Sequence, residues 1–124
     1  MDGQYVDMYE RTQQLKDPAS PIYGCDAFWN TFWNLNQLWA LATPDIMNKW
    51  VESLLEYYRV GGWLPNGPPG VEYCDIMGAQ HEIPLMVSAY QKGIRNYDVD
   101  KAYEAVKKTL TTQGTALSSG GIRQ

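Results

Sequence analysis

The sequence has few of the residue types from which most catalytic and metal centres are built. Among its 124 residues there are one histidine and two cysteines, Cys25 and Cys74. A catalytic triad would depend on His81 alone, and the sequence contains no His and Cys cluster that would hold a transition metal. The Gly-rich motifs that cradle phosphates are also missing. The two cysteines leave a disulfide or two buried free thiols open.

Positive charge and long hydrophobic runs are scarce as well. Ten Lys and Arg residues against 14 Asp and Glu residues give a net charge of −4. Because no basic stripe is present, a nucleic acid is not an expected partner. No apolar run approaches the ~20 residues of a membrane span, and the N-terminus does not read as a signal peptide. We therefore expect neither a membrane partner nor a signal peptide in this chain.

Apolar residues are plentiful, at 44% of the chain, with 5 Trp and 9 Tyr. This composition is typical of a folded chain, and the length predicts one domain. Prolines and a glycine before Cys25 predict a loop that ends a lead-in segment, residues 1–24. We expect the helical part to cover residues 25–112, and residues 113–124 to form a flexible tail.

Apolar periodicity predicts four helices, over about residues 25–42, 44–59, 80–95 and 98–112. The first is apolar on nearly every side, so it must be buried on most of its surface. The second is amphipathic. An inner apolar helix followed by an outer amphipathic one is how helical hairpins stack into solenoids or close into toroids. Four helices cannot surround the first, so we predict an all-α fold that belongs to a larger helical array or oligomerises.

A Gly- and Pro-rich loop at residues 61–70 and the segment that follows it combine an aromatic ring with carboxyl groups. Trp63 is predicted to be exposed there, with Glu72 and His81 nearby in sequence. Sugars present an apolar face and a ring of hydroxyls, so this mixture suits a sugar site. Each residue also has a plain structural interpretation: Trp63 as a lid over a local core, Glu72 and Glu82 as solvated charges, and His81 as a capping or core residue.

Three further tryptophans, Trp29, Trp33 and Trp39, lie in the first predicted helix. Indoles at helical spacing on an apolar segment are interpreted as core residues. Composition alone therefore leaves sugar binding as one hypothesis among several.

The order of landmarks over about residues 25–108 resembles the first part of the catalytic domain of glycoside hydrolase family 92, the calcium-dependent exo-α-mannosidases. The matching landmarks are Trp29-x-Thr31-Phe32, the GGWLP motif at 61–65, Glu72, His81, Pro84, the AYxKGI motif at 89–94 and the DxxKAYEA motif at 98–105.

The resemblance implies a fold, a mechanism and a set of residues. The fold would be inner and outer helical hairpins forming part of an (α/α)6 toroid, and the mechanism an inverting one in which calcium engages the mannose hydroxyls. The family's acid, base and calcium ligands lie downstream of this stretch, so no catalytic or metal residue carries over. The residues that carry over form a sugar-binding wall: Asn30, Trp63, Glu72 and His81.

Two departures from the family's WDTFR motif fall close together, since Asn30 replaces its acid and Trp33 its arginine. An amide still makes hydrogen bonds, but it cannot form the ion pair, whose partner is also gone. The paired change indicates a divergent subgroup with altered glycan preference.

The resulting hypothesis is a fragment of a periplasmic or extracellular α-mannosidase. Its partners would be a mannose-containing glycan and the remainder of the toroid. Calcium would belong to the whole enzyme and not be bound by this fragment, which should be inactive alone. Two alternatives remain: a non-catalytic glycan-binding module, and a helical interaction module that assembles with a partner.

Overall fold

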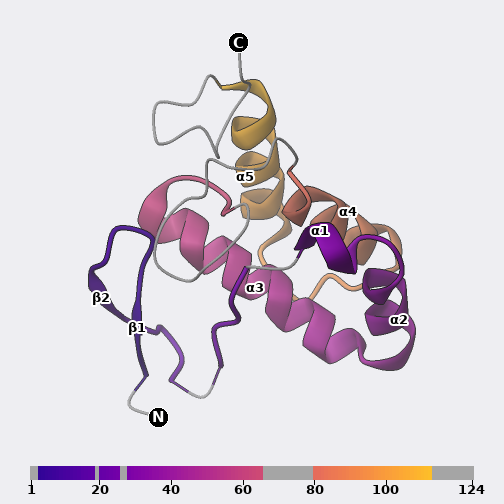
Figure 1. Cartoon of the computed structure of the whole chain (residues 1–124), viewed down its shortest axis with the longest axis horizontal. Helices are drawn as coiled ribbons and strands as arrows, with labels where there is room; N and C mark the ends of the chain where they lie inside the picture. Colours follow the sequence, from indigo (N-terminus) through magenta and orange to yellow (C-terminus); the bar gives the residue numbers. More distant parts are fainter. Residues whose placement is uncertain (1–2, 19, 26–27, 66–79, 113–124) are drawn as a thin grey trace.

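The structure is a computed structural model of the chain that describes residues 3–18, 20–25, 28–65 and 80–112. In this part of the chain, two short strands precede five helices. They are β1 (Gln4–Val6), β2 (Thr12–Gln14), α1 (Phe28–Thr31), α2 (Leu35–Ala42), α3 (Pro44–Gly61), α4 (Glu82–Gln91) and α5 (Val99–Thr111). Helix α3 runs through the middle of the molecule (Figure 1).

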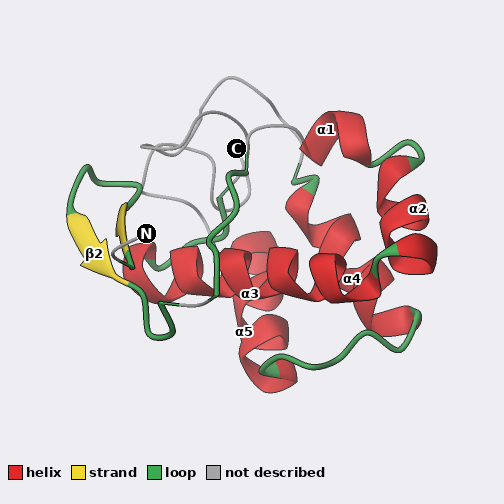
Figure 2. Cartoon of the chain, turned by 90° about the horizontal axis from the view of Figure 1, so that it is seen from below, coloured by secondary structure: helices red, strands yellow, loops and turns green. Residues whose placement is uncertain are grey.

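Helix α3 is central because its apolar stripe is buried by α2, α4 and α5. Pro44 starts the helix, where a missing N–H breaks no hydrogen bond, and Gly62 ends it with a left-handed φ of 80°. The stripe residues Met47, Val51 and Leu54 are fully buried. Figure 2 shows the strands and α2 at opposite ends of α3. The predicted second helix is confirmed and continues two residues further.

The predicted first helix is wrong in one respect, because the chain breaks it into α1 and α2. Residues 32–34 form a turn, and Asn34 has a φ of −153° just before α2. Asparagine favours such positions because its side chain competes with helical backbone hydrogen bonds. Trp29 and Trp33, predicted as core residues, are 43% and 75% exposed. The described helices leave this segment uncovered, as the shortage of predicted neighbours indicated.

The indole of Trp50, on α3, holds three preceding segments against that helix. Its ring centroid lies 4.9 Å from that of Tyr23 and 5.3 Å from that of Phe28 on α1. Trp39 on α2 stacks on it at 5.5 Å with an interplanar angle of 17°. Packed aromatic pairs of this kind add to the energy of area burial.

The lead-in segment contains an antiparallel hairpin that the sequence did not predict, so the all-α class is corrected to mostly helical with a small sheet. In the hairpin, Tyr5 on β1 lies opposite Gln13 on β2. Tyr5 also donates a hydrogen bond of 2.8 Å to Glu56 on α3. Strands of three residues with polar partners carry little periodic signal, which is why they were missed.

Asp7 organises the turn between the two strands. This buried carboxylate accepts hydrogen bonds from the backbone N–H groups of Tyr9 at 2.8 Å and Arg11 at 3.0 Å. It also accepts from the side chains of Arg11 and Gln13, both at 2.8 Å. Burial would raise the pKa of Asp7, but these four donors hold it below its ordinary value.

Helix α5 is capped locally and tied to α3. The side chain of Asp98 accepts from the backbone N–H of Lys101 at 2.9 Å, as expected of an N-cap residue. Tyr58 on α3 donates a hydrogen bond of 2.8 Å to Glu104. Burial and this bond raise the pKa of Tyr58 to about 12. The predicted fourth helix is confirmed, and α4 is shorter than predicted.

Several predictions fall outside the described residues. The tail at 113–124, Glu72 and Cys74 are among them, so a pairing of Cys74 with the buried Cys25 is not tested. Among the residues that are described, no helix is long and apolar enough to cross a membrane.

The Asp7 turn predicts an acid-sensitive hairpin. Asp7→Asn should lower the free energy of unfolding at pH 7 by about 1–3 kcal/mol, because the buried donors lose a charged acceptor. Folding lowers the pKa of Asp7, so ionised Asp7 stabilises the folded chain. This stabilisation is complete above the pKa that Asp7 has in the unfolded chain, and it is lost as the pH falls through the lower pKa of the folded chain. Urea unfolding between pH 7 and pH 2 measures the difference, which should shrink with acid. Glu10→Gln, at an exposed position of the same turn, is the control; equal stability of Asp7→Asn and wild type at pH 7 contradicts the prediction.

Candidate functional site

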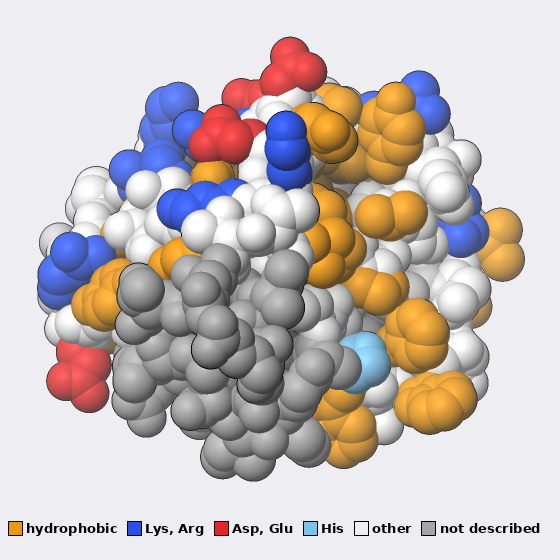
Figure 3. Space-filling view, turned by 90° about the horizontal axis from the view of Figure 1, so that it is seen from above, with side chains coloured by type: hydrophobic (Ala, Val, Ile, Leu, Met, Phe, Trp, Pro, Cys, Tyr) orange, Lys and Arg blue, Asp and Glu red, His pale blue; other side chains and the backbone are white. Residues whose placement is uncertain are grey.

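His81 lies at the start of α4, half-buried at the N-cap position. Its imidazole makes no capping hydrogen bond with the helix. Instead its ring centroid lies 5.6 Å from that of Phe32, which follows α1. Figure 3 shows His81 at the surface among hydrophobic side chains. The histidine therefore faces α1 and its turn rather than serving as a side-chain cap.

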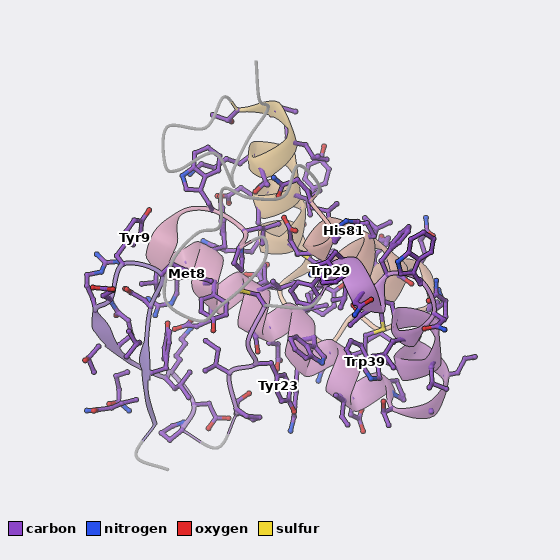
Figure 4. The ribbon with its side chains drawn as sticks, viewed as in Figure 1. Met8, Tyr9, Tyr23, Trp29, Trp39 and His81 are labelled. Carbon is purple, nitrogen blue, oxygen red and sulfur yellow. The ribbon has the colours of Figure 1, made fainter. Side chains whose placement is uncertain are left out.

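Asn30 is exposed on α1, a helix of only four residues. Phe28 anchors that helix by burying its ring beside Trp50. The hydroxyl of Thr31 donates to the carbonyl of Phe28 at 3.3 Å. With one side fixed in this way, the other side of α1 presents the Asn30 amide and Trp29 outward. Figure 4 shows Trp29 and His81 in the same region, where α1 lies beside the start of α4.

Two aromatic rings continue this surface beyond His81. Phe32 is 41% exposed and Trp33 is 75% exposed. Their ring centroids are 6.1 Å apart with an interplanar angle of 64°, an edge-to-face arrangement. Phe32 thus contacts both Trp33 and His81. We call Phe32 and Trp33 the aromatic edge.

Trp63 is not the exposed loop residue that was predicted, since only 9% of it is exposed. The left-handed Gly62 ends α3 and the chain then passes close to α5. Lys108 on α5 donates to the carbonyl of Gly62 at 2.7 Å, and its ammonium lies 4.7 Å from the centre of the Trp63 ring. This cation–π contact holds the indole as part of the core.

Of the two glutamates considered at the sequence level, Glu72 lies outside the described residues, and Glu82 is not solvated. Glu82 begins α4 and is completely buried. Among the residues that the structure describes, neither carboxyl oxygen has a hydrogen-bond partner. Burial raises the pKa of Glu82 well above its ordinary value. Burial therefore favours the neutral form of this side chain, which directly follows His81 at the start of α4.

A metal ion finds no ligand set in the described ranges. No three His, Cys, Asp or Glu residues of 3–18, 20–25, 28–65 and 80–112 lie together as such a set. Calcium takes six to eight oxygen ligands, usually with several carboxylates among them. The described residues therefore do not supply a ligand set for the calcium that the resemblance implies.

Of the residues predicted to form the site, His81 and Asn30 lie near the aromatic edge, and Trp63 is buried elsewhere. His81 and the aromatic edge meet, and Asn30 lies two residues before Phe32 on the same short segment. Trp63 is engaged by Lys108 of α5. Sequence reasoning missed the aromatic edge because apolar helical spacing was interpreted as core. One signal did mark it: the resembling motif has an arginine where this chain has Trp33, and a charged residue indicates an exposed position.

The described part of the chain is mostly helical. Around α1, the turn after it and the residue before α4, it brings together an exposed amide, an imidazole and aromatic rings. The chain belongs to glycosyl hydrolase family 92: the catalytic domain of that family matches residues 1–123. The membership expected from the sequence is confirmed.

A solved structure shares the fold. It is the family 92 inverting mannosidase from Bacteroides thetaiotaomicron VPI-5482, with a TM-score of 0.74 and 24% sequence identity. The similarity covers 94% of this chain and 15% of that one. The chain therefore spans a small part of that mannosidase's length. No curated protein matches this chain.

The buried Glu82 predicts a pH effect opposite to that of Asp7. Folding raises the pKa of Glu82, so as the pH rises Glu82 loses its proton in the unfolded chain before it does in the folded chain. The free energy of unfolding therefore falls as the pH rises above the ordinary glutamate pKa of about 4.3. Glu82→Gln should raise the melting temperature at pH 8, and the gain should shrink towards pH 4. Thermal unfolding followed by circular dichroism measures this. Glu52→Gln, a half-buried position on α3, is the control. A lower melting temperature of Glu82→Gln at pH 8 would show that the carboxyl is ionised and paired.

Trp63 and Trp33 form a matched pair of indoles, one buried and one exposed. Trp63→Ala should lower the free energy of unfolding by about 3–5 kcal/mol, because it leaves a cavity beside Lys108. Trp33→Ala should change it by no more than about 0.5 kcal/mol. Denaturant unfolding of both variants checks the contrast. Similar losses in the two would contradict the assigned burial.

Proposed function

We propose that this chain is part of the catalytic domain of an inverting, calcium-dependent α-mannosidase, and that it supplies part of the sugar-binding wall. The family match over residues 1–123 supports a glycoside hydrolase. The observation that carries the proposal further is the placement of His81 against the segment that presents Asn30. The substrate is a glycan with terminal α-linked mannose.

Asn30 and His81 are the proposed sugar contacts of the described residues. An amide donates and accepts, and a neutral imidazole does the same through its two nitrogens. Side chains that both donate and accept hydrogen bonds suit vicinal sugar hydroxyls, because each hydroxyl is also a donor and an acceptor. Asn30 is exposed and His81 half-buried, so both can reach a ligand.

Trp63 has a different proposed role, because it is buried under Lys108. Its role is structural, because its contact with Lys108 holds the end of α3 against α5. Glu72, the fourth predicted contact, stays a prediction. It would accept hydrogen bonds from sugar hydroxyls as a carboxylate.

The bond-breaking groups are proposed to lie outside this chain. Inversion needs an acid and a base about 6.5–9.5 Å apart on opposite faces of the sugar. The buried carboxyl of Glu82 touches no solvent and cannot activate water. We place the acid, the base and the calcium ligands on the remainder of an (α/α)6 toroid.

The same remainder is the proposed protein partner. Leu38 and Leu41 on α2 are 56% and 82% exposed, and exposed aliphatic side chains gathered on one helix mark an interaction surface. Further helices of the toroid would cover them. Because the substrate is a glycan, we propose that the whole enzyme lies in the periplasm or outside the cell.

The proposal predicts sugar binding without turnover. The 124-residue chain should bind methyl α-mannoside weakly in an NMR titration and should release no mannose from a chromogenic α-mannoside. His81→Ala should weaken binding about fivefold, which corresponds to about 1 kcal/mol and to the loss of one hydrogen bond.

Gln91→Ala is the matched control, since Gln91 is exposed at the other end of α4. It should leave the affinity unchanged. Mannose release by the chain alone would overturn the placement of the acid and base elsewhere. Equal binding by wild type and His81→Ala would overturn the role of His81.

A further inference from the structure

We propose that the aromatic edge, Phe32 and Trp33, is a stacking platform for the apolar face of the sugar ring. The sequence had offered Trp63 for that role, but Trp63 is buried and Trp33 is 75% exposed. This inference rests on the proposed function, because it names the surface on which the same ligand lies.

The aromatic edge lies close to the proposed polar sugar contacts, His81 and Asn30. Phe32 lies 5.6 Å from His81 and 6.1 Å from Trp33, measured between ring centroids. Phe32 is therefore the ring that contacts both the exposed indole and the imidazole. Asn30 is exposed on the same short segment. Stacking and hydrogen bonding can thus act on one ligand.

The chemistry of the segment favours a neutral ligand with hydroxyl groups. Residues 28–42 contain no charged residue. Asn30 and Asn34 are exposed amides on either side of the edge. A flat indole offers an apolar surface at little cost in side-chain entropy, and the amides supply paired donors and acceptors. A pyranose, with an apolar C–H face and peripheral hydroxyls, meets both requirements.

A protein partner is the rival occupant of exposed aromatic side chains. The aliphatic residues Leu38 and Leu41 on α2 suit that role better, because an aliphatic side chain offers no flat ring on which a sugar can stack. The edge differs from them in its ring contact with His81. We therefore assign the sugar to the edge and the protein partner to α2.

The test compares Trp33→Ala with Leu41→Ala in the 124-residue chain. Both side chains are more than two-thirds exposed, so neither variant should unfold. Each is titrated with methyl α-mannoside while amide and indole N–H signals are followed by NMR. Glycerol, which has hydroxyls but no ring, is the control ligand. Trp33→Ala should weaken mannoside binding about tenfold, or about 1.4 kcal/mol, and Leu41→Ala should not.

The outcomes separate this inference from the proposed function. If His81→Ala weakens binding and Trp33→Ala does not, the platform is overturned and the wall stands. If only Trp33→Ala weakens binding, the platform stands and the role of His81 fails. Both are overturned if no signal moves with the mannoside, or if glycerol moves the same signals. A change in oligomeric state with Trp33→Ala shows a protein interface and overturns the platform.

Discussion

The packing of three aromatic rings around Trp50 is the constraint on which the rest of the molecule depends. Tyr23 comes from the lead-in segment, Phe28 from α1 and Trp39 from α2, so one side chain of α3 fixes three segments that precede it. The position of α1 follows from this cluster. So does the direction in which its outer face presents the polar and aromatic groups of the candidate site.

The fold could be predicted where local rules and packing agree. Pro44 and Gly62 fix the ends of α3 through the backbone, and the side chain of Asp98 caps α5. All three act locally, and α3 and α5 begin close to where the predicted helices over 44–59 and 98–112 begin. The hairpin could not be predicted, because its stability comes from the buried Asp7 and from contacts with α3 rather than from strand periodicity. The break at Asn34 was missed for a similar reason, since apolar periodicity continues through it.

The candidate site was predicted in part. The sequence selected His81 and Asn30, and the structure places them on neighbouring elements. The sequence did not predict how deeply each of these side chains is buried. An indole after a glycine pair can be exposed or covered, and Trp63 is covered by residues distant in sequence, Lys108 among them. In the same way a glutamate at a helix start is usually solvated, whereas Glu82 is enclosed.

The brevity of α1 has a consequence for how such a surface can vary among related enzymes. Its ring contact with α3 comes from Phe28, and Thr31 is buried as well, while the outward positions of α1 contribute little to the core. Replacement of those outward side chains is therefore largely independent of folding. The two positions at which this chain departs from the resembling motif are both exposed, Asn30 on α1 and Trp33 in the turn that follows it. A short helix and the turn after it thus let natural selection change exposed side chains without rebuilding the scaffold.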